Sequence, residues 1–292
     1  MATTVQQAFR EFASNLEPRA YSREDAAARR DHLVGLLRKQ FDVLKAFESG
    51  SLIRYTAVRD YADLDIMAVL HYSKHIKGKT PTQVLNDVAA PLRDYGPRVR
   101  RNGQAITLHY KTWPNVDLVP VYYNGDSLDK PDHYGVPDST RGIWLKSRPV
   151  NHSNRMSKRN SDDDCGPLFK RLVKMAKWWN LKHGAYLQSF HIEVIALNTF
   201  SSHLSESDYP WHAYRWFKKA AELVAAGNLW YDVSHVDGYL NATRKNEAVT
   251  RLRRAESQGS QAWHLTYGTN KDHRSAIAKW RTVFPDRFPA YG

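Results

Sequence analysis

Apolar residues at helical spacing place helices on both sides of a middle part that carries shorter apolar runs. They predict a helix over 6–16, which Pro18 ends, and a longer one that starts at Ser22 and continues through Phe47. For the longer helix, Ser22 and Asp25 approximate a capping box. Five further helices are expected, over 80–92, 167–183, 211–226, 244–257 and 272–283. Three strand-like runs lie between them, at 63–70, 105–110 and 115–122, and the last two are expected to pair.

Aspartates stand in two of the strand-like runs. Side chains of a strand alternate between its faces, so Asp63 and Asp65 are expected on one side and Leu64 and Ile66 on the other. Two adjacent carboxylates repel unless a cation lies between them, and oxygen ligands favour a hard ion such as Mg²⁺. Asp117 interrupts the later run, where a buried carboxylate without a partner would cost several kcal/mol. Three carboxylates on adjacent strands could hold two Mg²⁺ ions.

A Gly-Ser pair precedes the two aspartates and changes their interpretation. Alone, an Asp-x-Asp pair is more often a solvated strand face or a turn, and a Gly-Ser pair is more often a helix-ending turn. Gly50 lets the backbone approach an anion closely, and the Ser51 hydroxyl with adjacent amides could hold the β- and γ-phosphates of a nucleotide. The combination of Gly50 and Ser51 with Asp63 and Asp65 favours the phosphate role.

The order Gly50-Ser51, Asp63-x-Asp65 and a distant strand aspartate, Asp117, resembles the polymerase-β-like nucleotidyltransferases. It resembles most closely the bacterial cGAS/DncV-like nucleotidyltransferases (CD-NTases), which make cyclic oligonucleotide signals in the anti-phage defence called CBASS. The stretch 170–197 adds to the resemblance through its Lys-x-Trp element and its Ser-Phe-His-x-Glu helix start. The resemblance covers most of the chain.

The resemblance implies an α/β (α+β) fold with two lobes. A mixed catalytic sheet backed by a long spine helix is expected over 1–150, and a helical lobe that closes the nucleotide cleft over 151–292. The active site would lie in the cleft between the lobes. No internal repeat, low-complexity tract or obvious linker divides the chain.

The resemblance also assigns roles to side chains. Asp63 and Asp65 would bridge two Mg²⁺ (or Mn²⁺) ions, and Asp117 would hold the ion that lowers the pKa of the attacking ribose hydroxyl. Lys177 and Ser189 match residues that contact the nucleotide triphosphate in the family. A helix N-terminus already suits phosphate, which gives Ser189 an independent reason.

Three residues near Ser189, one aromatic and two polar, need an interpretation of their own. Phe190 is a candidate for stacking on a nucleobase, which could be worth about 1 to 3 kcal/mol, but it fits a place in the core at least as well. His191 and Glu193 are interpreted as structural, because neither falls in a zinc-ligand spacing.

Several charged segments keep an open interpretation. Lys177 belongs to a stripe with Lys170 and Lys174, and such stripes usually face solvent. The run 141–160 has six basic and no acidic residues, and it is expected to be either a mobile surface segment or a linker that lines the substrate cleft. The aspartates at 162–164 are expected to cap the following helix.

Composition limits the class of protein. The formal net charge of +13 at pH 7 favours anionic partners such as nucleotides or nucleic acid. The one cysteine, Cys165, excludes an internal disulfide framework and an all-cysteine metal site. No apolar run is long enough to span a membrane and no signal peptide is recognised, so a cytoplasmic protein is expected.

The expected reaction joins ribonucleoside triphosphates such as ATP and GTP into a cyclic di- or trinucleotide and releases pyrophosphate. The alternatives are a linear oligonucleotide product, transfer to RNA or protein, and a non-catalytic nucleic-acid-binding protein. The last is disfavoured because a carboxylate cluster without metal repels phosphate. The resemblance also implies two partners, an effector that responds to the cyclic product and ubiquitin-like conjugation machinery acting at Gly292.

Overall fold

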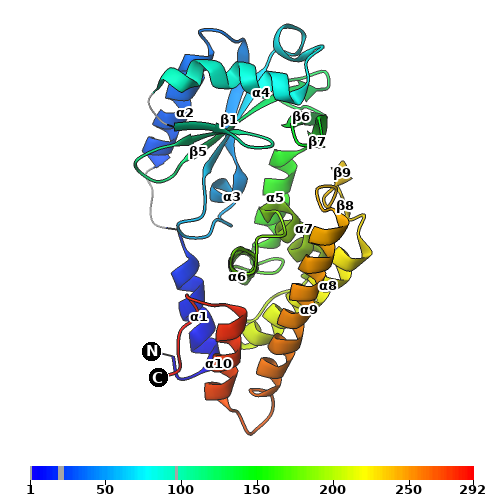
Figure 1. Cartoon of the computed structure of the whole chain (residues 1–292). Helices are drawn as coiled ribbons and strands as arrows, with labels where there is room; N and C mark the ends of the chain where they lie inside the picture. Colours follow the sequence, from blue (N-terminus) through cyan, green and yellow to red (C-terminus); the bar gives the residue numbers. More distant parts are fainter. Residues whose placement is uncertain (1, 19–22, 96–97) are drawn as a thin grey trace.

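The computed structural model describes residues 2–18, 23–95 and 98–292. The chain forms a lobe built on a β-sheet and a lobe built almost entirely of helices, one above the other in Figure 1. Both predicted classes of element are therefore present, and the mixed α/β architecture with a helical lobe is confirmed.

Seven strands form one mixed sheet. They are β1 (Val43–Ser49), β2 (Leu64–Leu70), β3 (Arg98–Arg101), β4 (Ile106–His109), β5 (Val116–Asn124), β6 (His133–Asp138) and β7 (Ile143–Ser147). The order is β1-β2-β5-β4-β3, with β6 pairing to the end of β5 and to β7. Strands β2 and β5 are parallel, and the other neighbours are antiparallel.

The two strands at the centre of the sheet bring the predicted aspartates together. In the parallel register of β2 and β5, Asp65 is the partner of Asp117. In the antiparallel register of β1 and β2, Asp65 is the partner of Ser49. The end of β1, the start of β2 and the start of β5 therefore meet at one edge of the sheet, where Gly50 and Ser51 follow.

The two faces of the sheet differ. One face is apolar, with Leu64 and Ile66 of β2 packed in a core under α2 (Arg23–Leu37) and α4 (Pro81–Ala89). Figure 1 shows these two helices covering the sheet lobe on its outer side. The opposite face carries Asp65, Met67 and Val69, because side chains alternate along the strand. This face turns toward the helical lobe.

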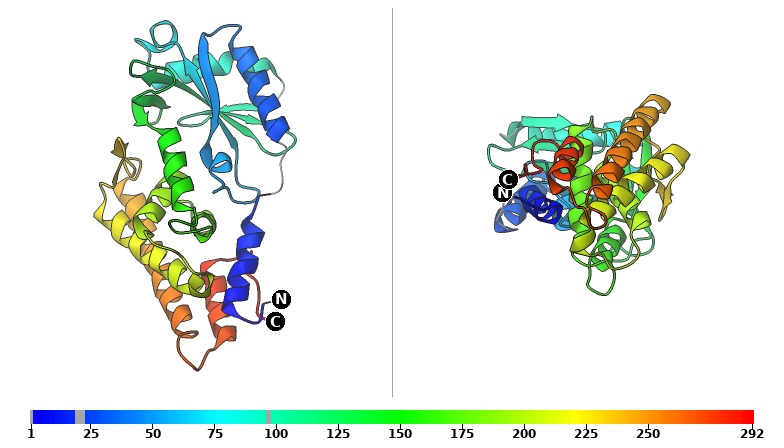
Figure 2. Two further views of the ribbon diagram at one scale, coloured as in Figure 1. Left: turned by 180° about the vertical axis from the view of Figure 1, so that it is seen from behind. Right: turned by 90° about the horizontal axis from the view of Figure 1, so that it is seen from below.

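The helical lobe contains α1 (Val5–Leu16), α5 (Pro149–Arg159), α6 (Leu168–Lys182), α7 (Ser189–Thr199), α8 (Tyr209–Ala226), α9 (Ala242–His264) and α10 (His273–Val283). A short hairpin, β8 (Trp230–Tyr231) and β9 (Ser234–His235), follows α8. The first helix joins the last, since the Phe9 ring lies 5.0 Å from Trp280 and 5.1 Å from Phe288 between centroids. Figure 2 shows the two chain ends side by side. The division of the chain at residue 150 stays a prediction, and α1 packs in the core of the helical lobe.

The expected helix over 22–47 is wrong in its second half. The helix α2 ends at Leu37, and residues from Val43 form β1, which pairs along β2. Leu44 and Phe47 fit helical spacing in the sequence. However, the backbone groups along one edge of β2 need hydrogen-bond partners, and antiparallel pairing with β1 supplies them. Gly50 and Ser51 therefore follow a strand and not the spine helix. The capping box at Ser22 lies outside the described residues.

Two expectations about charged segments are also corrected. The basic run over 141–160 is not a mobile segment, because it folds as β7 and α5. The aspartates at 162–164 give α6 no side-chain cap, and Asn160 Oδ1 instead accepts from the backbone N–H of Lys170 at 3.1 Å. Asp164 pairs with Arg159 at 3.1 Å.

None of the helices in the described part of the chain combines the length and the apolar character needed to cross a bilayer.

Candidate active site

Gly50 is placed directly against one of the predicted catalytic carboxylates. It has φ +80°, a conformation that favours glycine, and a Cβ added there would lie 1.6 Å from Asp65 Oδ2. Glycine therefore serves two needs at once, a left-handed backbone after β1 and room for the Asp65 side chain. Ser51 follows in the single turn α3 (Gly50–Ile53), and its carbonyl accepts from the Thr56 N–H at 2.9 Å.

The three aspartates form a cluster of like charge. Asp63 lies immediately before β2, Asp65 within it, and Asp117 opposite on β5. Burial, then the charges of Asp117 and Asp63, raise the pKa of Asp65 to about 7, against the opposing pull of Arg54. Burial and the charge of Asp63 also raise the pKa of Asp117.

A hydroxyl group holds Asp117 in place. Thr107 of β4 donates to Asp117 Oδ1 at 2.5 Å, and this bond lowers the pKa of Asp117 in opposition to burial. Across residues 2–18, 23–95 and 98–292, no three His, Cys, Asp or Glu side chains are already arranged around a common metal position. The donor chemistry nevertheless fits a divalent cation, because such a charge would relieve the repulsion that raises these pKa values. Asp65 also keeps part of its surface open to solvent.

Lys177 reaches the same region from the helical lobe. Its ammonium group donates to the Thr56 carbonyl and the Thr56 hydroxyl, both at 3.1 Å, and to Glu193 Oε1 at 2.7 Å. The expectation that the lysine stripe faces solvent is wrong here, since Lys177 and Lys174 are buried. All three N–H bonds of the Lys177 ammonium group have partners. Lys174 pairs with Glu17 at 2.5 Å.

Glu193 is the centre of a buried network that joins both lobes. Its carboxylate is fully buried and accepts from Arg54 Nε at 3.0 Å and from the Thr56 hydroxyl at 2.5 Å. It also accepts from His152 Nε2 at 2.7 Å. Burial would raise the pKa of Glu193, but Arg54, Lys177 and His152 together hold it well below its ordinary value. The carboxylate is therefore charged and tightly paired.

The network continues into a cavity beside the sheet. His152 Nδ1 lies 2.9 Å from the Tyr231 hydroxyl, and the Phe190 ring lies 4.6 Å from His152 and 5.7 Å from Tyr231 between centroids. Phe190 and Tyr231 line a cavity of about 190 Å³ whose opposite wall includes Met67 of β2. Phe190 is thus part of a cavity wall. Ser189 begins α7 and is exposed.

The residues around Glu193 are only weakly indicated by the sequence. Glu193 is one acid among apolar residues over 190–197, the same signal that Asp117 gives, and the structure shows the partners that such a buried charge requires. Arg54 and Thr56 follow Gly50 closely in the sequence, which only weakly indicates that they belong to the site. Nothing in the sequence connects Tyr231 to His152, because the hairpin that carries Tyr231 is positioned by the fold.

Comparisons with known proteins agree with this geometry. A family model described as "Second Messenger Oligonucleotide or Dinucleotide Synthetase domain" matches residues 3–160. A cyclic AMP-AMP-AMP synthase of Acinetobacter sp. (strain ATCC 27244 / 9458) is 26% identical, and the alignment covers 98% of this chain and 86% of the relative. A probable cyclic nucleotide synthase of Bacillus cereus (strain VD146) is 25% identical over 66% of this chain. That match spans only 57% of the Bacillus protein.

Solved structures share the fold along nearly the whole chain. CdnC of Escherichia coli MS115-1, solved with ATP, has a TM-score of 0.73 at 19% identity, covering 98% of this chain and 99% of that chain. CdnG of Bradyrhizobium diazoefficiens, a CD-NTase in complex with GTP, has a TM-score of 0.70 at 12% identity, covering 97% and 96%. The chain therefore belongs to the family of Second Messenger Oligonucleotide or Dinucleotide Synthetase domains and is a nucleotidyltransferase of the cGAS/DncV-like type.

Proposed function

We propose that this enzyme joins ribonucleoside triphosphates into a cyclic di- or trinucleotide, with release of pyrophosphate, as a signal in anti-phage defence. The observation that carries the proposal is the register that pairs Asp65 with Asp117 beside Gly50. The name of the Acinetobacter relative supports a cyclic triadenylate as the first product to test.

Asp63, Asp65 and Asp117 are proposed as the ligands of Mg²⁺ or Mn²⁺. When bound, the metal would lower the pKa of the attacking ribose hydroxyl and neutralise charge on the triphosphate. Gly50 leaves the Asp65 carboxylate free to face this site, and the Ser51 hydroxyl would bind the β- and γ-phosphates together with neighbouring amides.

Lys177 is proposed to contact the triphosphate, which requires a change in its present hydrogen bonds. Because its three N–H bonds are taken by Thr56 and Glu193, Lys177 must release one partner to reach a phosphate oxygen. The Thr56 hydroxyl is the easiest to release, since it can keep its own bond to Glu193. Substrate binding and the Glu193 network are linked in this way.

Phe190 is proposed to stack on a nucleobase, together with Tyr231 across the cavity. Their ring centroids lie 5.7 Å apart at an interplanar angle of 77°, so one ring at a time can present its face to a base. Stacking on an aromatic ring is worth about 1 to 3 kcal/mol per base. Ser189, exposed at the start of α7, is proposed as a second phosphate contact.

The partners proposed for this enzyme act on its product or its chain. They are an effector protein that responds to the cyclic nucleotide and ubiquitin-like conjugation machinery at Gly292. The Gly292 N–H donates to the Ala2 carbonyl at 3.3 Å, so conjugation would require the tail to leave the N-terminus. CdnC of Escherichia coli has been solved in a complex named CdnC:HORMA-deltaN, which supports a protein regulator as a further partner. A cytoplasmic location stays a prediction.

The decisive experiment incubates the purified protein with all four radiolabelled ribonucleoside triphosphates and Mg²⁺ or Mn²⁺. Products are treated with phosphatase and resolved beside an Asp63→Ala, Asp65→Ala control. A phosphatase-resistant product that is absent from the control is expected, and omission of single nucleotides would name its bases. A phosphatase-sensitive product would favour a linear oligonucleotide. No product, even after addition of RNA, DNA and cell extract, would contradict the proposal.

A further inference from the structure

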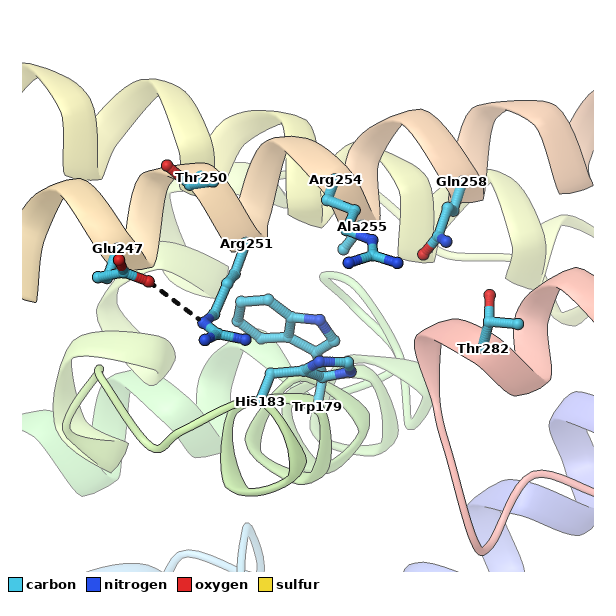
Figure 3. A pocket seen from close by; sticks show the side chains of 9 residues that line it. All are labelled: Trp179, His183, Glu247, Thr250, Arg251, Arg254, Ala255, Gln258 and Thr282. Carbon is cyan, nitrogen blue, oxygen red and sulfur yellow. Dashed lines mark ion pairs between the residues drawn. The ribbon is translucent and has the colours of Figure 1, made fainter.

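A second cavity lies in the helical lobe, away from the catalytic carboxylates. It measures about 340 Å³ and is enclosed by the end of α6, the middle of α9 and the end of α10. Figure 3 shows Trp179 of α6 and His183, which directly follows α6, below it, Arg251, Arg254 and Gln258 of α9 above it, and Thr282 of α10 at one end. This volume falls in the range of pockets that hold small organic molecules.

The floor of the cavity is aromatic. Trp179 and His183 stack with centroids 5.5 Å apart and an interplanar angle of 29°. The Nε2–H of His183 donates to the Val283 carbonyl at 3.0 Å, which fixes the ring between α6 and α10. Burial, and then the charges of Arg251 and Arg254, lower the pKa of His183 against this bond. At neutral pH His183 is therefore uncharged, with Nδ1 as an acceptor.

The roof of the cavity carries positive charge that the protein leaves only partly paired. Arg251 Nε is 3.7 Å from Glu247 Oε2, beyond hydrogen-bonding distance, and is buried without a hydrogen-bond partner among the described residues. Arg254 has neither an ion pair nor a side-chain hydrogen bond to any residue that the structure describes. Two guanidinium groups and one carboxylate therefore line the cavity, and that carboxylate, of Glu247, pairs with Arg251.

We propose that this cavity binds a small organic anion whose phosphate or carboxylate pairs with Arg251 and Arg254 and whose planar ring lies against His183, which stacks on the buried Trp179. Guanidinium groups match the paired oxygens of both anions, and a ring above aromatic side chains gains contact area without adding charge. Gln258 and Thr282 supply hydrogen-bonding groups at the far end.

The proposed site is distinct from the active site, although both use α6. Lys177 and Trp179 point about 200° apart around the helix, because each residue turns it by about 100°. Lys177 contacts Thr56 and Glu193, whereas Trp179 faces α9 and the cavity. A ligand held by Arg254 and His183 would therefore leave the triphosphate site open.

The test measures binding of 1-naphthyl phosphate, 1-naphthoate and inorganic phosphate to the full chain by isothermal titration calorimetry. A nonhydrolysable ATP analogue at saturating concentration fills the active site throughout. We expect one 1-naphthyl phosphate per chain, bound about tenfold more weakly by Arg254→Ala. Arg253→Ala is the matched control, because it removes the same charge from an exposed neighbour on α9 outside the cavity.

The outcomes separate the source of the anion from the existence of the site. Comparable binding of 1-naphthoate would indicate that carboxylates also serve as ligands. Binding of 1-naphthyl phosphate without binding of 1-naphthoate would indicate a phosphorylated ligand. Gln258→Trp, which fills the cavity from another side, should abolish binding while leaving the unfolding temperature near that of the wild type. The proposal is overturned if no ring-bearing anion saturates at millimolar concentration, if both arginine variants bind equally, or if the probe binds only when the ATP analogue is omitted.

Discussion

The carboxylate cluster of the sheet and the Glu193 network are built from the same kinds of charged group, yet their electrostatics are opposite. At the sheet, Asp63, Asp65 and Asp117 face one another, and the pKa of Asp65 rises to about 7. At Glu193, a single carboxylate is surrounded by Arg54, Lys177, Thr56 and His152, and its pKa falls well below the ordinary value. At the first cluster, Arg54 and Lys177 do not offset burial and the repulsion between the carboxylates, whereas at the second the negative charge is fully paired.

This is the difference that we expect between a site that binds a cation and a charged network that stabilises the fold. Like charges buried side by side cost stability, which proteins tolerate where function needs it. The network at Glu193 joins the turn after α3 in the sheet lobe to α5 and α6 in the helical lobe. Exchanging one charged group in each cluster should therefore have opposite effects on stability.

The largest expected effect comes from Asp65→Asn. Turnover should fall by about 1,000-fold or more, because the proposed metal site would lose a ligand. In EDTA the same variant should unfold at a higher temperature than the wild type, since the mutual repulsion of the carboxylates is relieved. The measurements are product formation from labelled triphosphates and thermal unfolding with and without Mg²⁺. An unchanged turnover, or a lower unfolding temperature in EDTA, would contradict the comparison.

The next effect is on stability and comes from Glu193→Gln. Loss of the negative charge leaves Arg54 and Lys177 buried without their counter-charge, which should cost about 3 to 5 kcal/mol of unfolding free energy. Urea unfolding at pH 7 measures the loss. Glu222→Gln on α8 is the control, because its pair with Lys219 is exposed at 3.6 Å and should contribute about 0 to 1 kcal/mol. Equal losses in the two variants would show that the network is not a stabilising centre.

A smaller effect is expected from Gly50→Ala when it is compared with Gly78→Ala. The two glycines have φ values of +80° and +79°, so both substitutions carry a similar backbone cost of about 1 to 2 kcal/mol. Only at Gly50 would the added Cβ collide with Asp65, since a Cβ at Gly78 meets nothing within 4 Å. Turnover should therefore fall at least about tenfold further in Gly50→Ala. Similar turnover in both variants would mean that Asp65 can move without loss of catalytic activity.

The smallest effect is a pH dependence of the Glu193 contribution. The folded pKa of Glu193 lies below its unfolded value of about 4.5, so its stabilisation is complete above that pH and is lost as the pH falls toward the folded pKa. The difference in unfolding free energy between the wild type and Glu193→Gln should therefore be constant from pH 7 to about 5 and shrink below about 4.5. A difference that instead grew on acidification would mean that the pKa of Glu193 is raised.

Sequence reasoning found the parts of the site that local patterns encode. Asp65 and Asp117 stand in apolar strand sequences, and their alternation predicts the face on which they lie. The fold class was implied by the resemblance. The strand β1 was missed because residues 43–49 fit helical spacing as well as alternation, and only pairing with β2 decides between them.

The rest of the site depends on contacts between distant segments. Lys177 lies in a stripe that solvent normally covers, and it is buried because Glu193 and Thr56 reach it from other elements. Tyr231 meets His152 across 79 positions of sequence. No local pattern carries information about such pairs. A lone acid in an apolar helix, such as Glu193, is the signal that deserved more weight, because burial of its charge requires partners.

The packing of α1 against α10 determines the order in which this protein can be completed on the ribosome. Phe9 and Phe12 are fully buried in the folded structure, but their ring partners Trp280, Phe284 and Phe288 are translated much later. The strands of the catalytic sheet are translated between them and can pair in the meantime. The helix α1 can therefore meet α6 and Tyr209 earlier, but the aromatic core of the helical lobe is complete only after α10 and Phe288 have been made.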